Sequence, residues 1–376
     1  MSDAPVDDAD APTDTDIEEP DRKGVEQERS RIRKFINDLS PDELTSGAWF
    51  TRLFAKAMDS YSKKATWQYF QEKYAGVPAD AIVEMRIKIA ARYAQIEGAL
   101  SASAYSAAIV YGLGERSGPS KTAAPAGAVS GMVDLAFITR LQLCLAYDVS
   151  VLYRVPLDLS DPEDMWKLIK VALTIRSGEV AREAVTKGVP AVVRPLIKRY
   201  YSKEVLTAAR SLPIVGKHLA QRNVVKFGIP VVGVPLTIAL NRYTTLIAGR
   251  YARDVFRNEA RVIEIAQTLT RRSQHPKLML WVAWLVVMAD AKISDDEALL
   301  MRHLTRLVRE QHEINDEELA RLIETDQSEV LRRIDAEPDD LSDILDAANR
   351  VALVDGDLGT EEKQLLAELE GHCKRD

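Results

Sequence analysis

The strongest hydrophobic pattern in the chain covers residues 126–153, where apolar side chains occur on every side of a helical wheel. Such a helix is normally buried at the centre of a larger domain or inside a membrane. Only Asp134, Arg140 and Asp148 carry charge in this stretch, and a charge near mid-span argues against a membrane span. The pattern therefore predicts the central helix of an all-α domain. Because buried charges need partners, the three form either structural pairs with other helices or a central polar cluster with a function.

Helical periodicity continues on both sides of this stretch. Apolar residues over 49–58 are spaced to form one wide face, and residues 79–111 contain few helix breakers, which predicts a long helix. An aspartate, a proline and a glutamate at 161–163 are typical of a helix start. Residues 177–223 predict shorter basic helices between glycine and proline interruptions. The expected fold class is all-α.

The last hundred residues contain an internal repeat. Residues 284–304 align without gaps on residues 349–369, and each copy reads as a helix, a short acidic turn and a second helix. Two helical hairpins related in this way are predicted to pack on each other as one compact α domain.

The two acidic turns present carboxylates that suit a divalent cation such as Ca²⁺, although neither turn has EF-hand spacing. An alternative role is helix capping, with Ser294 and Glu297 as a capping box and Glu362 at the equivalent position. Both interpretations stay open from the sequence. The candidate metal ligands are Asp290, Asp296, Glu297, Asp355, Asp357, Glu361 and Glu362.

Charge divides the chain more sharply than its net value of −7 suggests. Residues 1–30 carry 11 acidic and 3 basic side chains, residues 31–274 carry 21 and 35, and residues 275–376 carry 25 and 12. We therefore predict a disordered acidic tail over 1–40, a basic helical domain over 41–272 and an acidic helical domain over 275–376. Opposite charges would also allow the acidic parts to mask the basic domain.

The basic region suits an anionic membrane surface, because residues 227–240 form an uncharged segment beside several arginines. Fourteen residues with two prolines and two glycines are too few to span as a helix, so the segment is interfacial, re-entrant or part of the core. No nucleic-acid-binding motif frames the basic residues, and no nucleic acid is expected. The candidate membrane-binding residues are Lys226, Phe227, Ile229, Val232, Arg242, Arg250 and Arg253.

Two family resemblances follow from these motifs. The runs Gly131-Met-Val-Asp134-Leu and Ile229-Pro-Val-Val-Gly233 resemble the EcsC family over roughly residues 45–260. That resemblance implies a bacterial, cytoplasmic, multi-helical domain with a largely undefined biochemical role. The repeat, with Ala289-Asp290 and Val354-Asp355 opening its two turns, looks like the TerB-like domain of tellurite-resistance and stress proteins. It implies a smaller helical domain with suspected metal sites in its acidic turns.

The sequence favours a non-enzymatic protein of the cytoplasm that is peripheral to the inner membrane, related to stress or to the envelope. Its two cysteines, Cys144 and Cys373, fit a reducing compartment. The acidic domain would bind a protein partner or a divalent cation. One alternative is an enzyme acting on a lipid or a peptide, with Asp134 and Arg140 in a polar pocket. Another is a structural scaffold protein with no membrane contact.

Overall fold

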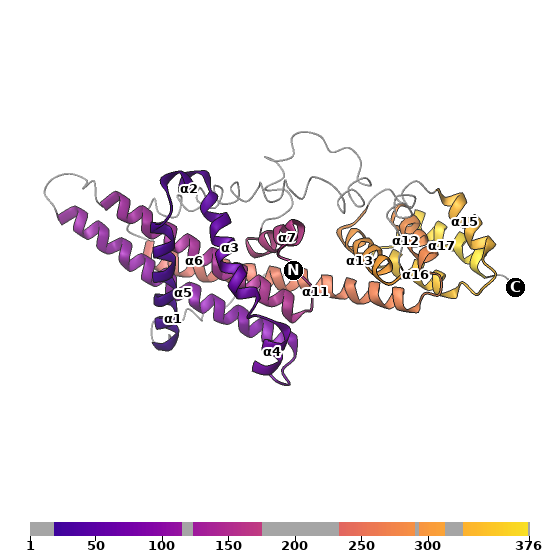
Figure 1. Ribbon diagram of the computed structural model, residues 1–376, viewed down its shortest axis with the longest axis horizontal. Helices are drawn as coiled ribbons and strands as arrows, with labels where there is room; N and C mark the ends of the chain where they lie inside the picture. Colours follow the sequence, from indigo (N-terminus) through magenta and orange to yellow (C-terminus); the bar gives the residue numbers. More distant parts are fainter. Residues whose placement is uncertain (1–18, 115–122, 175–232, 290–292, 313–325, 375–376) are drawn as a thin grey trace, which may run out of the picture. The chain divides into compact units, whose positions relative to one another are not determined.

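The computed structural model describes residues 19–114, 123–174, 233–289, 293–312 and 326–374. These residues form thirteen α-helices and no β-strand (Figure 1), which confirms the predicted all-α class. The acidic residues 1–18 and all of the predicted basic helices of 177–223 lie outside the described residues.

The helices belong to two compact units, which are described separately. The first unit contains the helices up to α7 (Pro162–Ala172) and residues 233–253 of α11 (Gly233–Arg272). The second contains residues 254–272 of α11 and every later helix. Sequence analysis placed the start of the acidic domain at residue 275, just beyond the end of α11.

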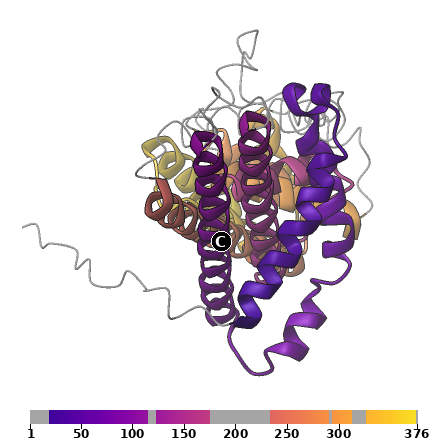
Figure 2. The ribbon, with the colours of Figure 1, turned by 90° about the vertical axis from the view of Figure 1, so that its left-hand side faces the viewer.

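In the first unit, α6 (Ala123–Leu152) packs against α5 (Ala79–Gly114) as a helical hairpin, and four further helices that precede α11 contact α6. Helix α11 also contacts α6, through Asn241 and beside Gly249. Figure 2 shows the first, indigo helices beside the two purple helices of this hairpin. Val133, Leu143 and Val149 of α6 have no exposed surface, as the apolar pattern predicts for a central helix. The four further helices are α1 (Glu19–Asn37), α3 (Ala48–Ser62), α4 (Trp67–Lys73) and α7.

Residues Gly131–Leu152 of α6 have the length and mean hydropathy of a membrane-spanning helix. However, 72% of this segment is buried inside the structure, and the core helix of a helical domain meets the same test. Its burial agrees with the sequence-based prediction of a central core helix.

Local sequence signals set several helix starts. Ser40 and Glu43 form a capping box at α2 (Pro41–Ser46), and Asp161 caps α7 by accepting a hydrogen bond from the Glu163 N–H (2.8 Å). Pro162 follows that cap in the first helical turn, as the sequence predicts.

The start of the chain differs from the sequence-based prediction. Residues 19–37, which were assigned to a disordered acidic tail, form α1, and its apolar side chains are buried in the first unit. These side chains recur at helical spacing, but they are few and lie among many charges. The prediction of disorder followed the charges and overlooked this spacing. The buried residues are Val25, Ile32, Phe35 and Ile36.

The second unit is built around α12 (Pro276–Val287), a short helix with buried residues on most of its sides. Helix α12 contacts each of the other helices of the repeat region, and the end of α11 contributes Val262, Ala266 and Leu269 to the same core. The other helices are α13 (Asp295–His312), α15 (Gln327–Ala336), α16 (Ser342–Ala352) and α17 (Thr360–Cys373). Each copy of the sequence repeat includes the end of one helix and most of the next, α12 and α13 in the first copy and α16 and α17 in the second.

A glycine allows α11 to approach the hairpin of the first unit closely. A Cβ atom at Gly249 would lie 2.8 Å from Ile87 Cγ1 and 3.0 Å from Leu145 Cδ2. We expect Gly249→Val to lower the free energy of unfolding by about 1–3 kcal/mol, because the added atoms overpack this contact. The measurement is urea-induced unfolding followed by circular dichroism.

Gly24→Ala is the matched control, because a Cβ atom at Gly24 in α1 meets nothing within 4 Å. Alanine favours a helix interior by up to about 1 kcal/mol over glycine, so this variant should be at least as stable as the parent. Equal stability of Gly249→Val and the parent would contradict the close approach.

Candidate functional site

The three charged residues of α6 do not gather into one cluster. Asp134 is 2% exposed, and its Oδ1 accepts a hydrogen bond from Nδ2 of the buried Asn241 in α11 (2.8 Å). Arg140 makes an ion pair with Glu28 of α1 (3.2 Å between Nη1 and Oε1). Each charge therefore has its own partner on a different helix, in agreement with the structural-pair interpretation.

Asp148 is the third charge, and it is fully buried. Its carboxylate accepts hydrogen bonds from the Tyr61 hydroxyl (2.7 Å) of α3 and from Arg86 Nε (2.8 Å) of α5. Arg86 Nη2 also donates to the Tyr61 oxygen (3.2 Å). Burial raises the pKa of Asp148, while the Arg86 guanidinium favours its charged form. This triad connects α3 and α5 to the central helix.

A second buried polar group lies near Asp134. Glu97 of α5 has no exposed surface, and its Oε1 lies 3.2 Å from Nε of Arg29 and accepts a hydrogen bond from the Ser101 hydroxyl (2.8 Å). Burial, with a smaller contribution from Asp134, raises the pKa of Glu97 to about 7, although Arg29 acts to lower it. Glu97 Oε2 and Arg29 Nη2 are buried without a hydrogen-bond partner. The sequence analysis did not identify this pair.

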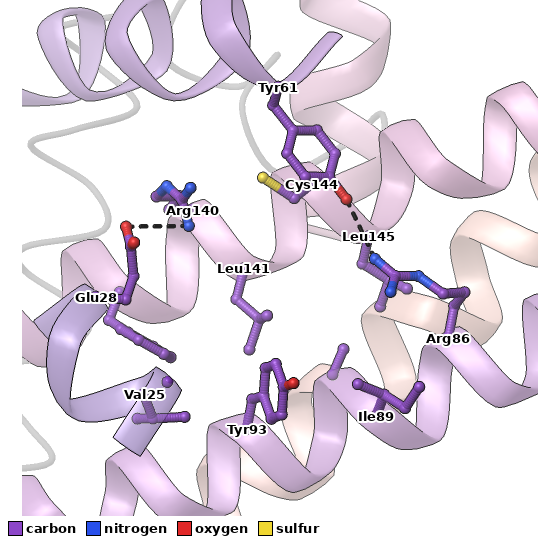
Figure 3. Close-up of a pocket in the computed structure, with 13 residues that line it drawn as sticks. Val25, Glu28, Tyr61, Arg86, Ile89, Tyr93, Arg140, Leu141, Cys144 and Leu145 are labelled. Carbon is purple, nitrogen blue, oxygen red and sulfur yellow. Dashed lines mark hydrogen bonds and ion pairs between the residues drawn. The ribbon is translucent and has the colours of Figure 1, made fainter. Parts of the chain in front are cut away.

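A cavity of about 270 Å³ lies in the first unit between α1, α3, α5 and α6. Figure 3 shows the Glu28–Arg140 ion pair on one wall and the contact between Tyr61 and Arg86 on another. The rest of the lining is mostly apolar, as in typical pockets for small molecules. The apolar lining residues include Val25, Ile89, Phe137, Leu141 and Leu145.

Two ionisable groups in this lining, Cys144 and Tyr61, are held in their neutral forms. Burial raises the pKa of Cys144 to about 12, so its thiol is protonated and unreactive at neutral pH. Burial and the nearby Asp148 raise the pKa of Tyr61 as well. Asp134, which the enzyme alternative placed in a pocket with Arg140, does not line this cavity. The carboxylate in this lining, Glu28, makes the ion pair with Arg140.

Of the predicted membrane-binding residues, some lie outside the described residues, some contact another helix and one is exposed. Lys226, Phe227, Ile229 and Val232 lie outside the described residues. Arg242 donates to Gln95 Oε1 (3.1 Å), and Arg253 pairs with Glu84, so both contact α5. Arg250 is exposed on α11.

Two large apolar side chains share an exposed face of α11 with Arg250. Tyr243 is 62% exposed and Ile247 is 39% exposed. Their spacing to Arg250 is i, i+4 and i+7, which places all three on one side of the helix. We call these three residues the α11 face. The sequence analysis missed Tyr243 and Ile247, although this spacing was readable, because it concentrated on the uncharged segment before them.

In the first acidic turn, the carboxylates already have partners. Asp290 lies outside the described residues. Asp296 accepts hydrogen bonds from Asn258 (2.6 Å) and Arg261 (3.0 Å). Glu297 accepts from the Ser294 N–H (2.7 Å), and its own N–H donates to the Ser294 hydroxyl (3.2 Å), which is the predicted capping box.

The second acidic turn is similar. Glu362 accepts from the Gly359 N–H (2.6 Å), and Asp355 accepts from the Asp357 N–H (3.0 Å), while Glu361 is exposed. Burial raises the pKa of Glu297, and the Asp355 and Glu362 carboxylates contribute to the rise, so acidic groups of the two turns lie close together.

One arginine connects the two turns. Arg261 Nη2 donates both to Asp296 (3.0 Å) and to the Val354 carbonyl (2.8 Å). A guanidinium therefore lies between Asp296 of the first copy and the residue before Asp355 in the second. Within the described residues, no group of three potential ligand atoms close enough for one ion includes these carboxylates.

Comparisons with protein-family models, with curated proteins and with solved structures found no match to the chain. The resemblances to the EcsC and TerB-like families therefore rest on the quoted motifs alone.

Burial of Glu97 predicts a specific pH dependence of stability. Its pKa of about 7 in the folded state exceeds the ordinary value of 4.5 for a glutamate, so between these values the folded chain holds a proton that the unfolded chain has lost. The free energy of unfolding should therefore fall as pH rises through this window, by on the order of 3 kcal/mol.

Glu97→Gln should remove most of this decline, since glutamine does not titrate. The measurement is the free energy of unfolding from about pH 5 to about pH 8 for both proteins. Glu26→Gln, which changes an exposed carboxylate on the same helix as Arg29, is the control and should keep the parent profile. A Glu97→Gln profile parallel to that of the parent would show that Glu97 is charged throughout.

The two cysteines should differ strongly in reactivity. Cys144 is buried with a raised pKa, whereas Cys373 is partly exposed near the end of α17. A thiol reagent at neutral pH should label Cys373 quickly and Cys144 only in denaturant, as measured by mass spectrometry of the labelled peptides. Fast labelling of Cys144 in the folded protein would contradict its burial.

Proposed function

We propose that the protein associates with anionic membrane surfaces through the α11 face. The observation that carries this proposal is the exposure of Tyr243 and Ile247 on one side of a helix, with Arg250 one turn further on. An exposed tyrosine and isoleucine can enter the headgroup region, where an amphipathic aromatic ring is favoured. The neighbouring arginine then contacts lipid phosphates.

The charge of the surrounding sequence supports an anionic surface. Residues 176–272 carry 18 basic and 6 acidic side chains, so this part of the chain is attracted to a negative surface potential. Such attraction falls with salt, because mobile ions screen it. Arg242 and Arg253 contribute less than the sequence suggested, since each contacts a polar side chain of α5.

The wider proposal follows the sequence analysis. The protein is non-enzymatic, cytoplasmic and peripheral to the inner membrane, with a stress-related or envelope-related role that the EcsC-like and TerB-like motifs support. The second unit, which carries the acidic turns, serves as a module for a protein partner.

The cavity supports a second candidate function, the binding of a small apolar or amphipathic molecule. Its apolar lining would cover the body of such a ligand, and the Tyr61–Arg86 and Glu28–Arg140 contacts would orient a polar end.

Co-sedimentation with liposomes tests the membrane proposal. The full chain should bind vesicles containing anionic lipid, bind neutral vesicles less, and lose affinity as salt is raised. The double variant Tyr243→Asp, Ile247→Asp should lose binding, and Arg250→Glu should weaken it roughly 10-fold, since each basic residue near the surface contributes about 1 kcal/mol.

Leu353→Asp is the matched control. Leu353 is 53% exposed but lies in the second unit, outside the α11 face, so its change should leave vesicle binding intact. If the α11 variants sediment with anionic vesicles as well as Leu353→Asp does, the membrane proposal is wrong for this face.

A further inference from the structure

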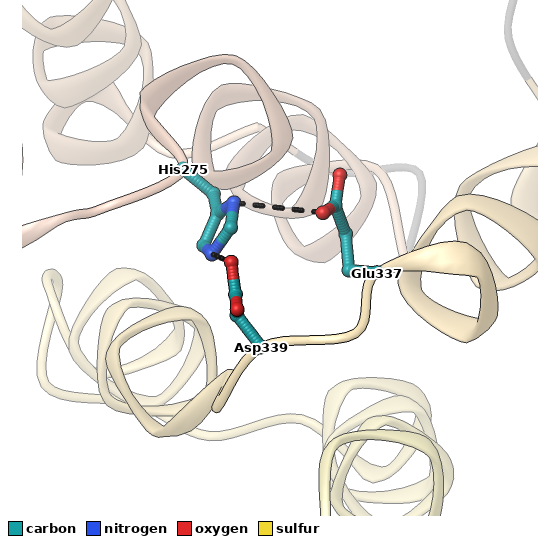
Figure 4. Close-up of side chains that lie close together, drawn as sticks. All are labelled: His275, Glu337 and Asp339. Carbon is teal, nitrogen blue, oxygen red and sulfur yellow. Dashed lines mark ion pairs between the residues drawn. The ribbon is translucent and has the colours of Figure 1, made fainter.

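His275 lies between two carboxylates that are distant in the sequence. Its Nδ1 is 3.9 Å from Oε2 of Glu337, and its Nε2 is 3.9 Å from Oδ2 of Asp339 (Figure 4). One potential ligand atom from each of the three residues lies within 4.8 Å of the others. Among the described residues, these three form the group of possible metal ligands that lie close enough to hold one ion. None of the three belongs to the acidic turns.

The imidazole is not satisfied by hydrogen bonds to these carboxylates. Both separations of 3.9 Å exceed hydrogen-bond length. Nε2 of His275 is buried and has no hydrogen-bond partner. A buried nitrogen left without a partner costs free energy, which a bound cation would recover.

The backbone around the imidazole is firmly positioned. His275 is the residue before α12, and Pro276 starts the helix. Just upstream, the Ser273 hydroxyl (3.1 Å) and the Gln274 N–H (2.8 Å) both donate to Asp343 Oδ2 in the first turn of α16. These bonds hold the start of α12 against the segment that carries Glu337 and Asp339.

The two carboxylates retain freedom to close on an ion. The Glu337 side chain is 39% exposed and the Asp339 side chain is 66% exposed, whereas that of His275 is 16% exposed. Ligands on a tetrahedral ion with bonds of about 2.0–2.2 Å lie about 3.4 Å apart. Side-chain rotations that move the Glu337 and Asp339 carboxylates by roughly 1 Å would therefore bring the three ligand atoms to this separation.

We propose that His275, Glu337 and Asp339 bind a divalent transition-metal ion such as Zn²⁺. One imidazole nitrogen and two carboxylate oxygens suit Zn²⁺, whereas Ca²⁺ takes oxygen ligands only. Solvent would supply the fourth ligand from the exposed side. The bound ion would fasten the start of α12 to the segment between α15 and α16, and so stabilise the second unit.

The test is titration of the metal-stripped full chain with Zn²⁺ by calorimetry, and with Co²⁺ by visible absorption. We expect one tightly bound ion per chain, a Co²⁺ spectrum typical of nitrogen and oxygen ligands, and an increase in melting temperature with Zn²⁺. Ca²⁺ should not displace Zn²⁺.

Three variants locate the ion. His275→Gln and Asp339→Asn should each weaken Zn²⁺ binding by more than about 100-fold, because each removes a direct ligand. Loss of a group that only hydrogen-bonds a ligand costs about 10–100-fold. Asp339→Asn changes a mostly exposed side chain, so it tests the site even if His275→Gln fails to fold. His372→Gln is the matched control, because His372 contacts the single carboxylate of Asp335 (2.8 Å).

Two results would overturn the proposal. One is the absence of stoichiometric Zn²⁺ binding, in which case His275 is simply held between two acidic side chains. The other is Zn²⁺ binding that survives Asp339→Asn or is displaced by Ca²⁺, which would place the ion at the acidic turns or elsewhere.

Discussion

The burial of α6 imposes the main constraint on the first unit, because the three charges of this helix each need a partner inside the protein. Successive residues turn by about 100° around a helix, so Asp134 and Arg140 point roughly 120° apart, and Arg140 and Asp148 roughly 80° apart. Asp134 and Asp148 point within roughly 40° of each other, but about 21 Å of helix axis separates them. Each charge therefore faces a different neighbour. The partners come from α11, from α1, and from α3 together with α5.

This arrangement makes the position of α6 specific as well as stable. A buried charge without its partner costs several kcal/mol, whereas apolar contacts tolerate small shifts of a helix along its axis. A slip of α6 by one residue would break all three polar contacts at once, although its apolar surface would still be buried. The cavity lies beside two of these contacts, so the side chains that line it are held in place by the same pairs.

Much of the fold was predictable from local sequence, because the relevant signals lie within a few residues of one another. The long helix over 79–111, the start of α7 at Asp161 and the capping box of Ser294 and Glu297 are of this kind. Helix α1 was missed because its charges dominate its composition, while only four of its apolar side chains are buried.

The sites were less predictable, since their residues meet only in the folded chain. Tyr61 lies 87 residues and Arg86 lies 62 residues before their partner Asp148. His275 and Glu337 have no local spacing that a ligand motif could match. Sequence can show that Asp148 needs a partner, but it does not show which side chain the packing brings to it.

Arg261 gives the acidic turns a counter-ion that is part of the polypeptide. Because its guanidinium contacts Asp296 and the Val354 carbonyl, the positive charge between the two turns does not depend on ion concentration and no chelator can remove it. A calcium-dependent hairpin pair can release its cation, whereas the charge of Arg261 belongs to the chain. Arg261 is therefore a fixed link between the two copies of the repeat.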